Sequence, residues 1–450
     1  ALTTGSDNIA IGKATLATED AHGRNIAIGS GALYYLNAGI DAQNVAVGYQ
    51  AGAAMTTGQY NILLGGECGD GLTTGTKNIA IGFRALGAED AHGRNVAIGY
   101  YALAVQNAGA DAYNVAIGYY AGKAITTGVR NVIMGGLAGD ALTTGSYNVA
   151  VGYDALSTED GDGRNVAVGY QALTTQNAGA DAYNVAVGFY AGTAVTTGTY
   201  NTLIGGQAGD ALTTGARNVA IGFNALTTED GDGRNVAVGY EALKTQNAGA
   251  DAYNVAVGYQ AGLDLTSGIN CVLVGRGAGE NVTTGGTNTC VGAKAGDALT
   301  EGSNNILIGY NAAASAVDVD NEITLGDANI SAFRCADQSI AALSDGRDKS
   351  EVEESPYGLE FINKLKPVKF TWDFRPEHMS DTKQGKSRVG FIAQDLQEAM
   401  PNNDNDVLDL VYEINENRLE AKYGNLIPIM AKAIQELSEE VKELKKQING

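Results

Sequence analysis

A short motif that recurs along most of the chain constrains its fold more than any other feature. The motif reads Asn-Ile-Ala-Ile-Gly at residues 8–12 and returns, with other apolar residues in its middle places, up to residues 322–326. Only Cys271 and Glu322 replace the leading Asn. The first four motifs begin at Asn8, Asn25, Asn44 and Asn61, and the same pattern of intervals starts again at Asn78, Asn148, Asn218 and Asn288. A unit this short must bury its apolar face against the next unit, so the sequence predicts a solenoid built in blocks of four units.

The motif itself predicts one short β-strand in every unit. Its β-branched residues fall on one face of the strand and Ala on the other, and we expect the β-branched face to form a packed core. Thr-Thr-Gly turns follow many strands, and the longer, 19-residue units carry Asn-Ala-Gly, so their extra residues belong in a loop. Parallel stacking in register at ~4.8 Å per strand would give a rod of roughly 85–90 Å, with a side-chain amide ladder of the leading Asn residues.

The composition argues against several classes of protein. The 62 Gly among 450 residues are twice the usual share of ~7%, and with 7% aromatic residues they do not suit an ordinary globular enzyme throughout. The net charge of −22 disfavours binding to nucleic acid or to an anionic membrane surface, and the absence of an 18-residue apolar run argues against membrane insertion. Cysteines 68, 271, 290 and 335 lack the paired spacing of a metal site or a disulfide scaffold, and no cofactor is expected.

The repeats resemble the coils of the trimeric β-roll heads of YadA-type bacterial adhesins, in which short Ala-Ile-Gly-like strands stack. The period of the repeats is longer than we expect in that family. The resemblance implies parallel stacking and a homotrimer. The predicted fold is therefore mainly β, a parallel β-solenoid or β-roll rod of 17- and 19-residue coils.

The composition changes at about residue 338, after which all five Pro residues and Trp372 occur. We predict a repetitive shaft over 1–337, a linker over 338–343, a small α+β domain over 344–426 and a coiled coil over 427–450. In the α+β domain, residues 368–372 alternate like a strand and 392–400 suggest a helix ended by Pro401. The coiled coil follows from a heptad pattern of apolar residues at Ile427, Met430, Ile434, Leu437, Val441, Leu444 and Ile448. By itself this pattern favours two strands, so it does not establish a trimer.

Four ordered motifs in this C-terminal part carry a second resemblance. They are residues 344–349 (Ser-Asp-Gly-Arg-Asp-Lys), 358–359 with 365–368, 390–396 with Pro401, and 423–426 before the heptads. Together they resemble the intramolecular chaperone domain of phage endosialidases and tail fibres, the S74 peptidase family. This resemblance implies a domain that assists trimer folding and then cuts itself off.

The same resemblance implies the residues of a self-cleavage site. Ser344 would be the nucleophile, Lys349 the base and Leu343-Ser344 the cleaved bond, with Asp345 and Arg347 as supporting residues. A neutral lysine amine can accept the serine proton, provided that burial lowers its pKa from ~10.4. The three His residues, at 22, 92 and 378, do not suggest a competing Ser/His/Asp triad.

Two further features of the repeats are candidate binding sites. An aromatic residue often follows the repeat Gly, and such rows either stack on sugar faces or pack between neighbouring coils or chains, which we favour. We select Tyr100, Tyr170 and Tyr240 as candidate receptor contacts. The loops at 159–163 and 229–233 have the D-x-D-G spacing of calcium ligands, but they lack the later ligands of an EF-hand. We interpret them as solvated acidic turns and predict no metal site.

These features predict a bacteriophage tail fibre: a homotrimer that binds a bacterial surface glycan or protein receptor. We expect it to be assembled in the host cytoplasm and to act outside the cell as part of the virion. A natural region before Ala1 would attach it to other virion tail proteins. Two alternatives stay open, a glycan-degrading tailspike, which would need paired carboxylates in a groove, and a bacterial trimeric surface adhesin.

Overall fold

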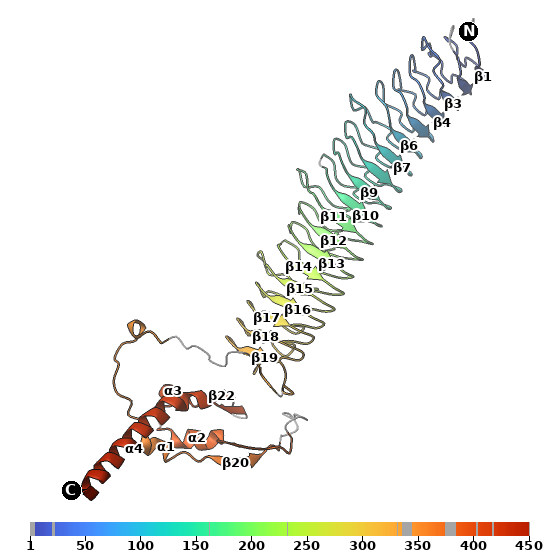
Figure 1. Ribbon diagram of the computed structural model, residues 1–450. Coiled ribbons are helices and arrows are strands. Elements are labelled where there is room, and N and C mark those ends of the chain that lie inside the picture. The colour runs from blue at the N-terminus through green and yellow to red at the C-terminus, as the bar shows by residue number, and fades with distance from the viewer. Residues whose placement is uncertain are drawn as a thin grey trace. The chain divides into compact units, whose positions relative to one another are not determined.

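The computed structural model describes residues 5–19, 23–161, 163–231, 233–330, 332–334, 344–373, 384–401, 404–415 and 418–449. The chain divides into two compact units, Ala1–Leu325 and Gly326–Gly450 (Figure 1). The first unit ends with the last repeat strand. The predicted linker 338–343 lies outside the described residues, and the boundaries drawn there stay predictions.

The first unit is a parallel β-solenoid, as the repeats predicted. Each strand pairs in parallel with the next one along the chain, and equivalent residues face each other, as in Val149↔Val166 and Ala150↔Ala167. Each coil is one repeat unit of the sequence. The strands are β1 (Ile9–Ile11), β2 (Ile26–Ile28), β3 (Val45–Val47), β4 (Ile62–Leu64), β5 (Ile79–Ile81), β6 (Val96–Ile98), β7 (Val115–Ile117), β8 (Val132–Met134), β9 (Val149–Val151), β10 (Val166–Val168), β11 (Val185–Val187), β12 (Thr202–Ile204), β13 (Val219–Ile221), β14 (Val236–Val238), β15 (Val255–Val257), β16 (Val272–Val274), β17 (Thr289–Val291), β18 (Ile306–Ile308) and β19 (Ile323–Leu325).

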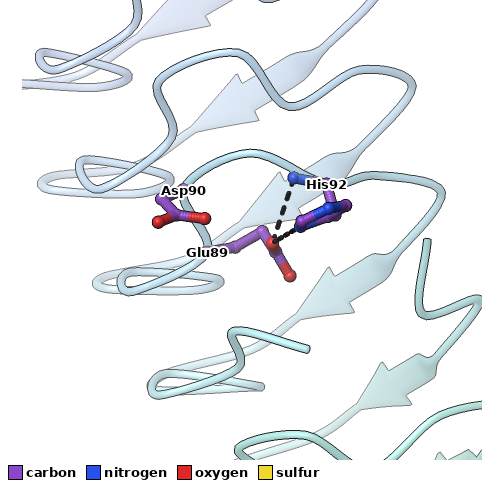
Figure 2. Close-up of side chains that lie close together, drawn as sticks. All are labelled: Glu89, Asp90 and His92. Atoms are coloured by element: carbon purple, nitrogen blue, oxygen red, sulfur yellow. Dashed lines mark hydrogen bonds and ion pairs between the residues drawn. The ribbon is translucent and has the colours of Figure 1, made fainter. Parts of the chain in front are cut away.

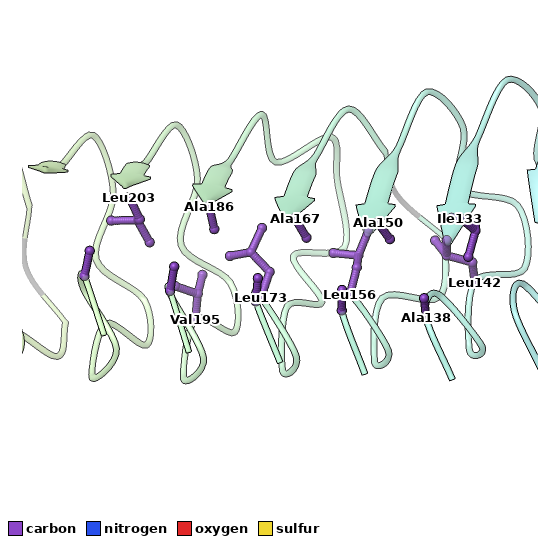
Figure 3. Close-up of a cluster of buried hydrophobic side chains, with 14 of the residues drawn as sticks. Ile133, Ala138, Leu142, Ala150, Leu156, Ala167, Leu173, Ala186, Val195 and Leu203 are labelled. Atoms are coloured by element: carbon purple, nitrogen blue, oxygen red, sulfur yellow. The ribbon is translucent and has the colours of Figure 1, made fainter. Parts of the chain in front are cut away.

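The core of the solenoid lies on the opposite strand face from the one we predicted. In β9 the central Ala150 is fully buried, whereas Val149 and Val151 are only half-buried. Figure 3 shows that Ala150 and Leu156 of one coil both point into its interior. The lumen of so short a coil is narrow, so a strand residue no larger than Ala leaves room for Leu on the opposite wall. The prediction that the β-branched face forms the core is therefore wrong within the single chain.

Glycine accommodates the larger strand residues in the lumen. Ile133 occupies the central place of β8 and is fully buried. Gly139 lies on the opposite wall of this coil with φ +52°, and a Cβ there would approach Ile133 Cδ1 to 3.1 Å and Leu142 Cδ1 to 2.8 Å. In some coils the larger residue lies on the strand and the smaller one on the opposite wall, and in other coils the order is reversed. The lumen stays filled in both cases.

A closing Gly after each strand lets successive coils lie directly on one another. Gly135 has φ +137°, a conformation that other residues rarely adopt, and a Cβ on it would overlap the carbonyl oxygen of Gly152 in the next coil. The Gly135 N–H donates to the Ile117 carbonyl of the preceding coil at 2.8 Å. Close backbone approach and interstrand hydrogen bonding therefore depend on the same residue.

The leading Asn residues form a buried ladder, but most of its bonds run from side chain to backbone. Asn131 Oδ1 accepts the backbone N–H of Asn148 at 2.9 Å, and Asn131 Nδ2 donates to the Gly145 carbonyl at 2.9 Å. A direct amide-to-amide bond joins Asn61 Nδ2 to Asn44 Oδ1 at 3.2 Å. The predicted amide ladder is corrected accordingly, since buried backbone groups need partners and the Asn side chains supply them.

The ladder ends at Glu322, the last residue in the Asn position. Its N–H donates to Asn305 Oδ1 at 2.8 Å, as an Asn would. Its carboxylate then accepts bonds from within the last coil, from Ser315 N at 3.1 Å, from Ser315 Oγ and from Thr324 Oγ1 at 2.8 Å. A carboxylate has no N–H to offer to a further coil.

The second unit is small and mixed. Its strands are antiparallel, β20 (Val368–Thr371) with β21 (Ser387–Gly390) and β22 (Val411–Asn415) with β23 (Arg418–Ala421). The strand predicted at 368–372 and the helix predicted at 392–400 are confirmed as β20 and α2. The helices are η1 (Gly346–Asp348), α1 (Leu359–Ile362), α2 (Ala393–Ala399), α3 (Asn405–Leu408), η3 (Tyr423–Asn425) and α4 (Leu426–Asn449). The buried core is Phe361, Leu396, Met400, Leu408, Leu410, Leu426, Ile429 and Ala433.

The long helix α4 has two apolar faces with different surroundings. Leu426, Ile429 and Ala433 are buried in the second unit. The predicted heptad residues are exposed, including Ile434 at 65% and Leu437 at 48%. A helix in a coiled coil buries this stripe against partner helices, so the heptad face of the single chain is unpaired. Within the described ranges, no helix is long and apolar enough to span a membrane.

We predict that Asn131→Ala destabilises the coils on either side of it. The change leaves the Asn148 N–H and the Gly145 carbonyl without these side-chain partners, at a cost of about 1–3 kcal/mol for each buried group left unpaired. Amide hydrogen exchange should become faster in the coils around residue 131, because each repeat contacts mainly its neighbours. Asn107→Ala, in an exposed loop, is the matched control and should exchange like wild type.

Candidate functional site

Ser344 and Lys349 lie side by side because the residues between them form one tight helical turn. Asp345 caps η1, where its Oδ1 accepts the Arg347 N–H at 2.9 Å. The turn brings the two side chains together, and Lys349 Nζ donates to Ser344 Oγ at 2.6 Å. The structure thus places an amine in direct contact with a hydroxyl, the pairing that a Ser/Lys nucleophile needs.

Asp345 and Arg347, the predicted supporting residues, bind each other across the same turn. Arg347 Nε lies 3.0 and 3.1 Å from the two carboxylate oxygens of Asp345, and Nη2 lies 2.5 Å from Oδ2. Hydrogen bonds from the Arg347 side chain and backbone hold the pKa of the Asp345 carboxyl below its ordinary value. Asp345 is therefore ionised near neutral pH, and its contacts stabilise the turn that positions Lys349.

The surroundings of this pair determine what it can do chemically. All residues from Ser344 to Ser350 are exposed in the single chain. Lys349 can accept a proton from Ser344 only as a neutral amine, and water favours the charged form. Leu343, on the other side of the predicted cleaved bond, lies outside the described residues. The chain supplies the hydrogen-bonded geometry of the pair, and the desolvation that catalysis requires must come from elsewhere.

Tyr100, Tyr170 and Tyr240, the candidate receptor contacts, each lie in the middle of a stack of three rings. Tyr100 stacks on Phe83 in one neighbouring coil, with 5.7 Å between ring centroids, and on Tyr119 in the other, at 5.6 Å. The equivalent stacks are Tyr153, Tyr170 and Phe189, and Phe223, Tyr240 and Tyr259. Neighbouring rings cover both faces of each middle ring, so these tyrosines present edges and hydroxyl groups to solvent.

A second aromatic row, which the sequence analysis did not identify, precedes the Asn ladder. In this row the Arg164 guanidinium lies 5.7 Å from the Tyr147 ring and 5.5 Å from the Tyr183 ring, in adjacent coils. Arg130 lies 5.3 Å from Tyr147, and Arg234 lies 5.3 Å from Tyr253. The signal in the sequence is that Arg or Tyr stands immediately before the motif Asn in every coil from Arg94 to Tyr253.

Glu89, Asp90 and His92 form a cluster that the sequence analysis also missed (Figure 2). Glu89 is fully buried, its Oε1 accepts the His92 N–H at 3.2 Å, and the same oxygen lies 3.9 Å from His92 Nδ1. One ligand atom from each residue lies within 4.8 Å of the others, so the three could hold a divalent cation. Burial raises the pKa of Glu89 to about 7. The D-x-D-G spacing concerns the Asp residues of these loops, whereas the buried acid is the Glu that precedes them.

The other acidic loops repeat only part of this arrangement in the described residues. Glu19, Glu159 and Glu229 occupy the equivalent place in every fourth coil and are fully buried. Glu159 Oε2 accepts a bond from Asn165 Nδ2 at 3.4 Å. Asp20, His22, Asp162 and Asp232, which belong to these loops in the sequence, lie outside the described residues. The interpretation of the loops as solvated turns does not hold for their buried glutamates.

The cysteines of the solenoid are buried in its lumen and are not paired. Cys68, Cys271 and Cys290 are free thiols, and burial raises the pKa of Cys68 and of Cys290 to about 12. These thiols therefore stay protonated and act as small apolar residues. Cys335 lies outside the described residues.

Residues 344–405 match the model of the Peptidase_S74 family, described as chaperone of endosialidase. The match begins at Ser344 and includes the turn that brings Ser344 and Lys349 together. It confirms the resemblance of the C-terminal part to this chaperone family, and the solenoid before it is consistent with a tail fibre or tailspike. No curated protein matches the chain.

Glu89 should make the stability of the solenoid depend on pH. Burial raises the pKa of Glu89 from 4.5 to about 7 in the folded chain. The favourable contribution of the protonated carboxyl is therefore fully present below pH 4.5 and is lost as the pH rises to about 7. Glu89→Gln cannot ionise at this position. Between pH 4.5 and about 7, we therefore expect its melting temperature to fall less than that of wild type. Glu301→Gln, at an exposed position, is the control, and parallel profiles of wild type and Glu89→Gln would contradict the prediction.

Proposed function

We propose that this chain is the subunit of a homotrimeric bacteriophage tail fibre whose C-terminal domain directs trimer folding and then removes itself by cleavage before Ser344. The observation that carries the proposal is the 2.6 Å contact between Lys349 Nζ and Ser344 Oγ at the first residue of the family match. The solenoid is the shaft, and it binds a bacterial surface glycan or protein receptor. Its further partners are other virion tail proteins.

The cleavage uses Ser344 as nucleophile and Lys349 as base. Neutral Lys349 takes the hydroxyl proton, and Ser344 Oγ attacks the carbonyl carbon of Leu343. The peptide bond to the Ser344 nitrogen breaks as Lys349 returns the proton to that nitrogen, which leaves an ester between Leu343 and Ser344 Oγ. Water hydrolyses the ester, so that the shaft ends in a carboxylate and the released domain begins with a free amine and hydroxyl at Ser344.

Trimer formation supplies the burial that this chemistry lacks in the single chain. Lys349 and Ser344 are exposed, and a second copy packed over them would favour the neutral amine. The exposed heptad face of α4 and the half-exposed β-branched face of the solenoid both offer apolar surface to further copies. Cleavage would then follow assembly, because only the trimer excludes water from the pair.

The repeats themselves explain why such a fibre needs a folding template. A shift of one chain against another by one block of four coils places nearly every side chain opposite its equivalent, so local pattern does not fix the alignment of three chains. Association of the C-terminal domains through α4 would fix the three chains at one end. After cleavage the template is gone, and unfolding of the shaft becomes difficult to reverse.

We predict that the wild-type chain yields two fragments, 1–343 and 344–450, and that Ser344→Ala yields uncut chain. Lys349→Arg should also stay uncut, because a guanidinium does not give up its proton to become the base. Ser350→Ala, at an exposed serine directly after Lys349, is the matched control and should be cut like wild type. Intact mass spectrometry measures the products. A fully cut Ser344→Ala chain would rule out this nucleophile.

A second prediction concerns the order of assembly and cleavage. The double change Ile434→Asp with Leu437→Asp places charges on the exposed heptad face of α4 and should prevent both trimer formation and cleavage. Glu440→Ala, at an exposed position of the same helix, should preserve both. Native mass spectrometry reports the oligomer and denaturing electrophoresis the cut. A monomeric, fully cleaved wild-type shaft would contradict the proposed trimer.

A further inference from the structure

The row of aromatic residues after the closing glycines is interrupted at regular positions. In one block of four coils the row runs through Phe83, Tyr100 and Tyr119, and Gly136 takes the fourth place before Tyr153 begins the next group. Gly206 interrupts the row in the same way between Phe189 and Phe223. Each interruption removes one ring from a stack that is otherwise continuous from coil to coil.

Neither place has a positive φ that would demand glycine, although a Cβ on Gly206 would meet Phe223 Cδ2 at 3.2 Å, so that ring would have to shift by a few tenths of an ångström. Gly135 needs its positive φ and has no space for a Cβ. The adjacent Gly136 has no positive φ, and a Cβ on it would meet ring atoms of Tyr153 at 3.5 and 3.8 Å, which is ordinary van der Waals contact. The same position carries Tyr or Phe in the neighbouring coils. A side chain would therefore fit at Gly136, and its absence leaves space beside Tyr153.

The missing ring separates two stacks, and Tyr119 and Tyr153 are the end rings on either side of Gly136; Tyr119 also contacts Tyr120 of its own coil, at 4.1 Å between centroids. Tyr119 stacks on Tyr100, and Tyr153 stacks on Tyr170, both with 5.6 Å between centroids. Tyr119 and Tyr153 are two coils apart, or about 9.6 Å at the strand spacing of ~4.8 Å. A flat ring placed halfway would lie at roughly the 4.5–7 Å centroid distance that stacked rings prefer on both sides. Tyr119 is 53% exposed and Tyr153 47%, so the gap opens to solvent.

We propose that Gly136 and Gly206 each open a stacking slot for one neutral hexopyranose ring of a bacterial surface polysaccharide. The slots are bounded by Tyr119 and Tyr153 and by Phe189 and Phe223. This inference rests on the proposed function, because it assigns the ligand class of the receptor-binding shaft. The related gap at Gly66 is different, since the Arg84 guanidinium lies 5.7 Å from the ring of Phe83 there.

The chemistry of the slots favours a neutral sugar. The apolar C–H groups of a pyranose face carry partial positive charge and are attracted to the negative faces of aromatic rings. At the Gly206 slot, Gln207 and Asn224 directly follow Gly206 and Phe223 and bond the carboxylates of Asp210 and Glu241, so polar groups that can pair with sugar hydroxyls lie next to it in the chain. The net charge of −22 disfavours an acidic polysaccharide.

The arrangement of the slots favours a polymer over a second copy of this chain. The slots lie four coils apart, about 19 Å along the solenoid, so a repeating ligand can occupy both at once. A second copy would present its rings in stacks of three, whose middle rings are already covered on both faces. Each gap is one missing ring high.

The test fills the slots with the residue that the row lacks. Gly136→Tyr with Gly206→Tyr completes the aromatic row, and Ala293→Tyr adds the same side chain to the same row away from the slots. Each protein is expressed with residues 1–450 and purified in the form that results. Its binding of cellohexaose and of maltohexaose is measured by calorimetry. We expect wild type and Ala293→Tyr to bind at least one of the two sugars, and the double variant to bind it at least tenfold more weakly. The melting temperature of the double variant should be unchanged or higher, because added rings extend the stack.

The outcomes separate this inference from the proposed function. If a trimeric, cleaved wild type binds neither sugar, or if the double variant binds as tightly as wild type, the slots are not sugar sites and the fibre proposal stands. If the double variant loses its trimeric mass, the gaps belong to contacts between chains and the inference is wrong. If the wild type binds sugar but neither trimerises nor cleaves itself, the result would support the proposed sugar sites and contradict the proposed tail fibre.

Discussion

The direct contact of backbone on backbone at the closing glycines determines the rest of the solenoid. A Cβ on Gly135 would overlap the Gly152 carbonyl, so each coil can lie flat on the next only where the side chain is a hydrogen atom. This contact fixes the register of the strands and brings equivalent residues of successive coils together. The Asn ladder, the filled lumen and the aromatic stacks all follow, because each is a row of like residues at that spacing.

The sequence alone was sufficient for the architecture of the shaft but not for which strand face is buried. The regular intervals between motifs determine the length of each coil. The two-residue period of a strand determines which residues share a face. Alternation does not say which face points inward. The width of the lumen decides, and that width depends on the turns opposite the strand, where Leu156 meets Ala150 and Gly139 meets Ile133. Those turns contain many residues with positive φ, Leu156 among them, which no local pattern identifies.

The candidate site was predictable to the extent that it lies within one short segment. Ser344 and Lys349 are close in the sequence, and a capped turn at Asp345 is enough to bring them into contact. The cluster of Glu89 and His92 was missed because its central residue is a buried carboxyl, and burial depends on the coil fold rather than on spacing. The open slots were missed for a related reason. Gly136 has the same letter in the sequence as Gly135, and only the backbone angles and neighbours distinguish a required glycine from a dispensable one.

The acceptor-only side chain of Glu322 also bears on how the length of such a shaft is set. Every Asn in the ladder accepts a bond from the coil that follows, so the ladder has a direction and can be extended by any coil that begins with Asn. Glu322 turns its oxygens back onto Ser315 and Thr324 and thereby closes the series. Duplication or loss of a four-coil block before Glu322 leaves the contacts between neighbouring blocks unchanged. The last coil of each block packs on the first coil of the next block in the same way. Shaft length can therefore change by gene duplication in steps of four coils, about 19 Å each, with the terminating coil unaltered.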